Sequence, residues 1–122
     1  MKYKALALDL DGTLTNREKK VPAGNKEAIE KAIDAGVKVI LASGRPLFGI
    51  TPIARELELD KKGGYILAYN GGCIVDCKTG KQMSATIMPQ DCIADICSLA
   101  RANGVYAVSY THLRAHETRS NL

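Results

Sequence analysis

Short apolar runs separated by longer amphipathic stretches dominate the first part of the chain. Between the first two runs, Ile29, Ala32 and Ile33 recur at helical spacing, and Gly36 follows as a typical helix stop. A strand, a helix and a strand in this order predict a βαβ unit with parallel strands. We expect the first strand to be buried on both faces, as is usual in parallel sheets. The predicted strands cover residues 4–8, 37–42 and 65–69.

The rest of the chain predicts a second helix, a hairpin and a third helix. The segment Pro46–Leu59 carries an apolar helical stripe, but proline breaks helix interiors, so the main helix is expected to begin near Pro52. Two antiparallel strands are expected around the turn Lys78–Lys81, and a helix from Pro89 to the stop at Gly104. The predicted fold class is therefore α/β, with a Rossmann-like parallel sheet and a β-hairpin.

Length and composition fit one cytoplasmic domain. The 122 residues carry a net charge of +4, and no apolar stretch is long enough to span a membrane or to resemble a signal peptide. Lysines and acids alternate on the predicted helices, and no basic run is interleaved with aromatic residues, so neither nucleic acid nor a membrane is an expected partner. The cysteines lack the spacing of zinc sites and are expected to be free thiols. They are Cys73, Cys77, Cys92 and Cys97.

Two carboxylates follow the first apolar run, at Asp9 and Asp11. Strand side chains two residues apart point the same way, so these carboxylates are expected to leave the strand on one side. Gly12 then permits a sharp turn. Like charges this close are usually kept for a bound cation or for acid–base chemistry. The plain alternative is a strand followed by an acidic surface turn.

A second polar motif, Ser43-Gly44-Arg45-Pro46, ends the second predicted strand. A hydroxyl, a glycine that lets an anion approach the backbone, and the N-terminus of the next helix together suit phosphate binding. The alternative is a strand–helix turn capped by serine. The third predicted strand ends in a strong turn signal at Asn70-Gly71-Gly72.

The segment Asp9–Thr13 resembles the first motif of the haloacid dehalogenase superfamily, Asp-x-Asp-Gly-Thr, and Ser43–Pro46 resembles the second motif as found in its Cof-type, sugar-phosphatase-like branch. The resemblance covers residues 1 to about 107. It implies an Mg²⁺-dependent phosphatase that hydrolyses small phosphorylated metabolites through an aspartyl-phosphate. The substrate stays open among sugar phosphates, nucleotides and phosphorylated cofactors, because the cap that selects it is largely missing.

The resemblance also assigns roles to individual residues. Asp9 would be the nucleophile, and Asp11 the general acid and base. Both would bind Mg²⁺, Asp9 through a carboxylate oxygen and Asp11 through its backbone carbonyl. The implied phosphate-binding residues are Ser43, Gly44, Gly12 and Thr13, and the implied substrate-proximal residues are Arg45 and Asn70.

Two parts of the family's site are missing from the sequence. One is the lysine of the third motif, and the other is an acidic pair in a Gly-Asp-x-x-Asn-Asp run, of which no Gly-Asp step occurs. The lysines in loops do not match the context of the third motif; they are Lys61, Lys62, Lys78 and Lys81. We therefore expect the N-terminal portion of a phosphatase, with half of the site and little activity alone. One sheet edge would also be unpaired, which favours self-association.

Three segments follow from the resemblance. Residues 1–84 are expected to form a partial core, residues 85–107 the start of an α/β cap, and residues 108–122 a non-native tail. The tail resembles one reading frame of a common transposase sequencing adapter, over Val108–Thr118. Two other hypotheses are a non-catalytic, self-associating α/β module and a receiver-like phospho-acceptor with Mg²⁺-binding aspartates.

Overall fold

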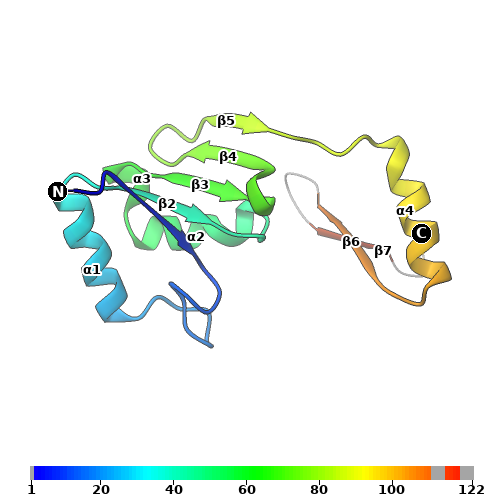
Figure 1. Cartoon of the computed structure of the whole chain (residues 1–122), viewed down its shortest axis with the longest axis horizontal. Helices are drawn as coiled ribbons and strands as arrows, with labels where there is room; N and C mark the ends of the chain where they lie inside the picture. Colours follow the sequence, from blue (N-terminus) through cyan, green and yellow to red (C-terminus); the bar gives the residue numbers. More distant parts are fainter. Residues whose placement is uncertain (1, 111–114, 119–122) are drawn as a thin grey trace. The chain divides into compact units, whose positions relative to one another are not determined.

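The computed structural model describes residues 2–110 and 115–118, which fall into two compact units divided between Ala85 and Thr86 (Figure 1). The described part of the first unit holds one sheet with the strand order β1-β2-β3-β4-β5. β1, β2 and β3 are parallel, and β4 and β5 add an antiparallel hairpin. The predicted α/β class with its β-hairpin is therefore confirmed. The strands are β1 (Ala5–Asp9), β2 (Lys38–Ala42), β3 (Tyr65–Ala68), β4 (Cys73–Asp76) and β5 (Gln82–Ala85).

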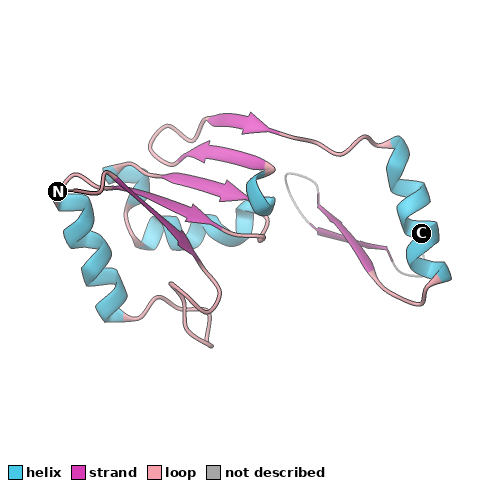
Figure 2. Ribbon diagram, in the orientation of Figure 1, coloured by secondary structure: helices cyan, strands magenta, loops and turns pink. Residues whose placement is uncertain are grey.

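Helices connect the parallel strands of the first unit (Figure 2). α1 joins β1 to β2, and α2 followed by the one-turn α3 joins β2 to β3. A 3₁₀ turn, η1, then leads from β3 into β4. The bounds are α1 (Ala23–Asp34), α2 (Leu47–Glu56), α3 (Leu59–Lys62) and η1 (Tyr69–Gly71).

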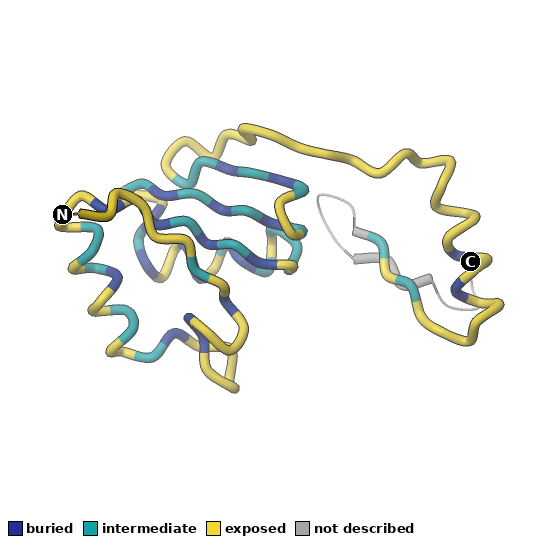
Figure 3. Tube along the Cα trace, in the orientation of Figure 1, coloured by how far each residue is buried: buried dark blue, intermediate teal, exposed yellow. Residues whose placement is uncertain are grey.

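One face of the sheet packs on the helices and the other is only half-buried (Figure 3). Along β2, Val39 and Leu41 are fully buried, while Ile40 between them is partly exposed. This alternation follows from the two-residue period of a strand, since successive side chains point to opposite faces. The buried face is completed from α2, the residue that follows it and α3 by Ile50, Ile53, Ala54, Leu57 and Leu59.

β1 differs from the sequence prediction. It lies at one edge of the described sheet, where its only partner is β2, and four of its five residues are exposed. Leu6, on the helix-facing side, keeps 36% of its surface accessible. The expectation of a first strand buried on both faces is therefore wrong for this chain. Burial on both faces requires elements packed over both faces, and only Leu8 of β1 packs against the hydrophobic core, partly buried.

α2 runs without a break through Pro52, so the prediction of a main helix beginning at that proline is also wrong. Proline removes one backbone hydrogen bond from the helix, and the hydroxyl of Thr51 donates to the carbonyl of Leu47 in the same turn, at 2.9 Å. Burial of Ile50 and Ile53 on either side holds the helix together.

The second unit contains α4 (Asp91–Ala102) and a pair of antiparallel strands, β6 (Ala107–Tyr110) and β7 (Ala115–Thr118). Cys97 and Ala100 form the buried side of α4. Of the predicted tail, residues 111–114 and 119–122 lie outside the described residues. The division into core and cap, and the adapter origin of the tail, stay predictions.

The cysteines are free thiols, as the sequence predicts. Cys73 and Cys97 are buried, Cys77 is half-buried and Cys92 is exposed. Burial raises the pKa of the Cys77 thiol to about 11, with the neighbouring carboxylates of Asp76 and Asp60 adding to the effect. Within the described chain, no helix combines the length and the apolar character that a membrane crossing requires.

Two glycines offer a matched test of this packing. A Cβ at Gly64 would lie 2.9 Å from the carbonyl oxygen of Val39 and 3.2 Å from the Leu59 side chain, whereas one at Gly24 in α1 would meet nothing within 4 Å. We expect Gly64→Ala to lower the free energy of unfolding in urea by about 1–3 kcal/mol. Gly24→Ala should instead leave it unchanged or raise it by up to about 1 kcal/mol. Equal effects would contradict the packing of β2 against this turn.

Candidate active site

The turn after β1 presents the first acidic motif. Asp9 is the last residue of the strand, and Gly12 follows with φ +79°, in the left-handed region that glycine adopts without strain. The carbonyl of the buried Leu10 holds the turn by accepting three hydrogen bonds. They come from the amide of Thr13 at 3.1 Å, the amide of Thr15 at 2.9 Å and the hydroxyl of Thr15 at 3.0 Å.

The turn after β2 carries the second motif. The Ser43 side chain is buried, and its hydroxyl oxygen accepts a hydrogen bond from the amide of Arg45 at 3.0 Å. The hydroxyl proton is then available to a ligand on the other side. Two further hydrogen bonds tie this turn to η1: the amide of Asn70 donates to the carbonyl of Ser43, and the amide of Tyr69 donates to the carbonyl of Arg45, both at 3.0 Å.

η1 is built from three successive residues with positive φ: Tyr69 at 53°, Asn70 at 56° and Gly71 at 93°. Non-glycine residues pay about 1–2 kcal/mol each for this conformation, and such strain persists only where the surroundings enforce it. In η1 this conformation brings the Asn70 side chain against Gly44, in the turn after β2. A Cβ on Gly44 would lie only 3.1 Å from the Asn70 side-chain oxygen, so no larger residue fits at Gly44 without moving that amide.

A shallow pocket of about 310 Å³ opens where these turns meet, at the carboxyl ends of β1, β2 and β3. This is the edge at which parallel α/β sheets collect their ligands. Four of the residues singled out from the sequence line it together, Asp9, Ser43, Gly44 and Asn70. The remaining lining residues are Ala42, Leu67 and Gly71.

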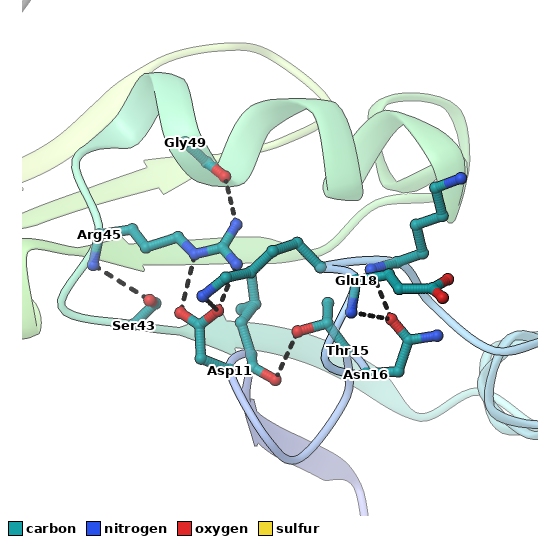
Figure 4. Close-up of polar contacts among 10 residues, drawn as sticks. Asp11, Thr15, Asn16, Glu18, Ser43, Arg45 and Gly49 are labelled. Carbon is teal, nitrogen blue, oxygen red and sulfur yellow. Dashed lines mark hydrogen bonds and ion pairs between the residues drawn. The ribbon is translucent and has the colours of Figure 1, made fainter.

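Two cations bind the carboxylate of Asp11, and Figure 4 shows its contact with Arg45. Arg45 donates from Nε to Oδ2 at 2.8 Å and from Nη2 to Oδ1, and Lys19 donates from Nζ to Oδ1 at 2.9 Å. The hydrogen bonds from Arg45, followed by that from Lys19, hold the pKa of Asp11 well below its usual range. The same contact raises the pKa of Arg45.

The chain is similar to known proteins in sequence and in fold. A profile of the haloacid dehalogenase-like hydrolase family matches residues 6–120. The chain belongs to this family. The match includes most of the segment that resembles an adapter, whose origin it leaves open. The assignment to the Cof-type branch, made from the Gly-Arg-Pro that follows Ser43, is confirmed with the family.

Three relatives show the extent of the similarity. The chain is 38% identical over 109 residues to the 5-amino-6-(5-phospho-D-ribitylamino)uracil phosphatase YwtE of Bacillus subtilis, covering 88% of this chain and 36% of that protein. It is 29% identical over 94 residues to the HMP-PP phosphatase of Serratia proteamaculans, covering 77% and 33%. A haloacid dehalogenase-like hydrolase from Bacteroides thetaiotaomicron matches with a TM-score of 0.85 at 37% identity, covering 98% and 45%. The chain thus spans less than half the length of these relatives.

The pocket is lined by only part of the predicted site residues. Asp11, Gly12, Thr13 and Arg45 are absent from the residues that line the pocket. Asp9 and Asp11 were expected to leave the strand on one side, but β1 ends at Asp9, so the two-residue period does not extend to Asp11. The acidic motif is therefore split in this structure between the pocket and the Arg45 contact.

Lys19 is a site residue that sequence reasoning missed. Its backbone has φ 63°, in a turn where the side-chain oxygen of Asn16 accepts hydrogen bonds from the amides of Glu18 and Lys20, at 3.0 and 3.1 Å. An asparagine followed by polar residues signals such a turn. No local sequence pattern predicts the ion pair between Lys19 and Asp11, because this contact forms only when the turn that contains Lys19 folds back on Asp11.

The described residues contain no group of three or more acidic, histidine or cysteine side chains that could enclose a metal ion. The oxygens of Asp9 and Asp11 are nevertheless the hard ligands that Mg²⁺ prefers, and this ion usually keeps several waters beside one or two carboxylates. The oxygens of Asp9 and Asp11 are therefore ligands of the type that Mg²⁺ requires, although they supply only part of its octahedral coordination shell.

Proposed function

We propose that the pocket binds the phosphate group of a small phosphorylated metabolite and that Asp9 accepts the phosphoryl group. One observation carries the proposal: Asp9, Ser43 and Gly44 line the same pocket. A nucleophile beside hydrogen-bond donors is the arrangement that phosphoryl transfer requires, since catalysis there rests on positioning and charge stabilisation.

The reaction would proceed in two steps. In the first, a carboxylate oxygen of Asp9 attacks phosphorus, the phosphorus–oxygen bond of the ester breaks, and the leaving oxygen takes a proton from Asp11. In the second, water attacks the aspartyl-phosphate and gives a proton to Asp11, which releases phosphate and restores the Asp9 carboxylate. Ser43 would donate a hydrogen bond to a phosphoryl oxygen throughout.

Mg²⁺ is part of the proposal. The side chain of Asp9 and the backbone carbonyl of Asp11 would hold it, and when bound it offsets the repulsion between the carboxylate and the phosphate. The names of two relatives support a small phosphorylated metabolite as substrate, a phosphoribitylamino-uracil for YwtE and HMP-PP for the Serratia enzyme.

The chain alone would be a poor catalyst. It lacks the lysine and the acidic pair of the family's later motifs. Lys61 and Lys62, expected in a loop, lie in α3 and pair with Glu58. Removing one preorganised donor typically lowers the rate about 10²–10³-fold. We therefore propose that this segment provides the nucleophile half of a site that other segments of a longer phosphatase complete.

Hydrolysis of p-nitrophenyl phosphate with Mg²⁺ tests the role of Asp9. We expect turnover at least about 10²-fold below the usual range of 1–10³ s⁻¹, because half of the site is missing. Asp9→Asn should abolish what remains, whereas Asp34→Asn, at the exposed end of α1, should leave it unchanged. Turnover that survives Asp9→Asn would contradict the assigned nucleophile, and an ordinary rate would contradict the half-site account.

If turnover lies below detection, calorimetry of inorganic phosphate binding tests the same pocket. Ser43→Ala should weaken binding roughly tenfold or more, because a hydrogen bond to a charged group contributes about 1.5–3 kcal/mol, and Ser43→Thr should retain it. Equal affinity in the wild-type chain and Ser43→Ala would contradict the phosphate site.

A second candidate function is self-association through β1, supported by the edge this strand leaves unpaired in the described sheet. The segment Lys4–Asp9 has a basic residue at one end, an acidic residue at the other and alternating alanines and leucines between. Two copies paired antiparallel about a twofold axis would set Lys4 opposite Asp9 and Ala5 opposite Leu8. An apolar hollow of about 350 Å³ beside the strand adds contact area; it is lined by Tyr3, Ala5, Leu6, Ala32 and Val37.

Light scattering across a concentration series tests this pairing. We expect the wild-type chain to form dimers and Leu6→Lys to be monomeric, because lysine on an edge strand blocks strand addition. Met83→Lys, on the exposed edge strand β5, is the matched control and should still dimerise. A monomeric wild-type chain, or dimers lost only in Met83→Lys, would contradict an interface at β1.

A further inference from the structure

The contact between Arg45 and Asp11 joins the two motifs of the proposed site. Arg45 donates hydrogen bonds to the Asp11 carboxylate from two nitrogens, and this paired geometry is stronger and more directional than one hydrogen bond. Lys19 occupies one of the same oxygens. Both carboxylate oxygens of Asp11 are therefore engaged away from the pocket, whose lining residues do not include Asp11.

Arg45 is itself anchored to the wall of the pocket. Its amide donates to the Ser43 hydroxyl oxygen, its carbonyl accepts from the amide of Tyr69, and its Nη1 donates to the carbonyl of Gly49 at 3.1 Å. Its side chain is only 21% exposed, against 67% for Lys19. Arg45 therefore holds Asp11 from a fixed position, while the solvated Lys19 contributes less.

The guanidinium group binds carboxylates and phosphates with the same paired geometry. Gly44, the residue before Arg45, lines the pocket, so a phosphate bound there lies one residue along the chain from the Arg45 backbone. A phosphate carries more negative charge than the Asp11 carboxylate. A phosphate within reach of the guanidinium would therefore compete with the Asp11 carboxylate for it.

Building on the proposed function, we propose that Arg45 is a positioning residue: it holds the Asp11 carboxylate outside the empty pocket and exchanges it for a phosphate group that enters. Asp11 is then free to turn toward the phosphate, where its proton transfers are needed. The arrangement couples arrival of the substrate to release of the acid–base residue, since the Nε and Nη2 donors that hold the carboxylate cannot hold a phosphate in the same paired geometry at the same time.

Nitrogen-15 NMR of the 122-residue chain tests the exchange, with inorganic phosphate as the probe. The Arg45 Nε–H signal is identified by its loss in Arg45→Lys and its retention in Arg55→Lys, an exposed arginine of α2. Phosphate should shift the amides of Ser43 and Gly44 and, with the same midpoint, the Arg45 Nε–H signal. In Asp11→Asn, that signal should already be displaced before phosphate is added.

The phosphate affinities from the same titrations distinguish two effects of Asp11: competition with phosphate for Arg45, and direct repulsion of phosphate by the Asp11 charge. Asp11→Asn should bind phosphate about fivefold tighter or more, the range of ordinary coupling between two ligands. This gain should disappear in the Arg45→Lys background, whereas a repulsive effect of the Asp11 charge would persist there. Two results would overturn the proposed exchange but not the phosphate site. One is phosphate-induced shifts at Ser43 and Gly44 while the Arg45 signal does not move. The other is a gain in phosphate affinity from Asp11→Asn that persists in the Arg45→Lys background. Unmoved amides at Ser43 and Gly44 would overturn the phosphate site as well.

Discussion

Two backbone hydrogen bonds position the candidate site. The amides of Tyr69 and Asn70 donate to the carbonyls of Arg45 and Ser43, so the turn after β3 is fastened to the turn after β2. Both turns follow neighbouring parallel strands, which places their polar groups at one edge of the sheet. The same fastening offsets the strain of consecutive left-handed residues and sets Asn70 against Gly44.

The structure divides the acidic motif between two environments. Asp9 lies in the pocket, where phosphate would bind, while Asp11 is neutralised by Arg45 and Lys19. A carboxyl whose pKa is held below its usual range is a poor proton donor, so the proposed acid catalysis by Asp11 requires that contact to loosen.

Sequence patterns predicted most of the fold and the composition of the pocket. Apolar runs and helical spacing identify the βαβ units, and the polar ends of the parallel strands identify Asp9, Ser43, Gly44 and Asn70, which the structure brings together. Each of these features is local or follows from strand direction, which is why a single sequence suffices for it.

The remaining features depend on tertiary contacts. β1 is exposed because burial depends on the elements packed around it. α2 passes through Pro52 because packing of its apolar side outweighs one lost hydrogen bond. Lys19 reaches Asp11 only once the polar turn has folded back, so neither this ion pair nor the absence of Asp11 from the pocket lining follows from spacing.

The most direct test of the central claim is a crystal structure of this chain grown with Mg²⁺ and tungstate, an anion with the shape and charge of phosphate. We expect the anomalous signal of tungsten to lie in the pocket, with tungstate oxygens within hydrogen-bond distance of the Ser43 hydroxyl and the Gly44 amide and with the Asp9 carboxylate facing the tungsten atom. Tungsten bound elsewhere, with the pocket free of it, would contradict the claim that these turns form a phosphate site.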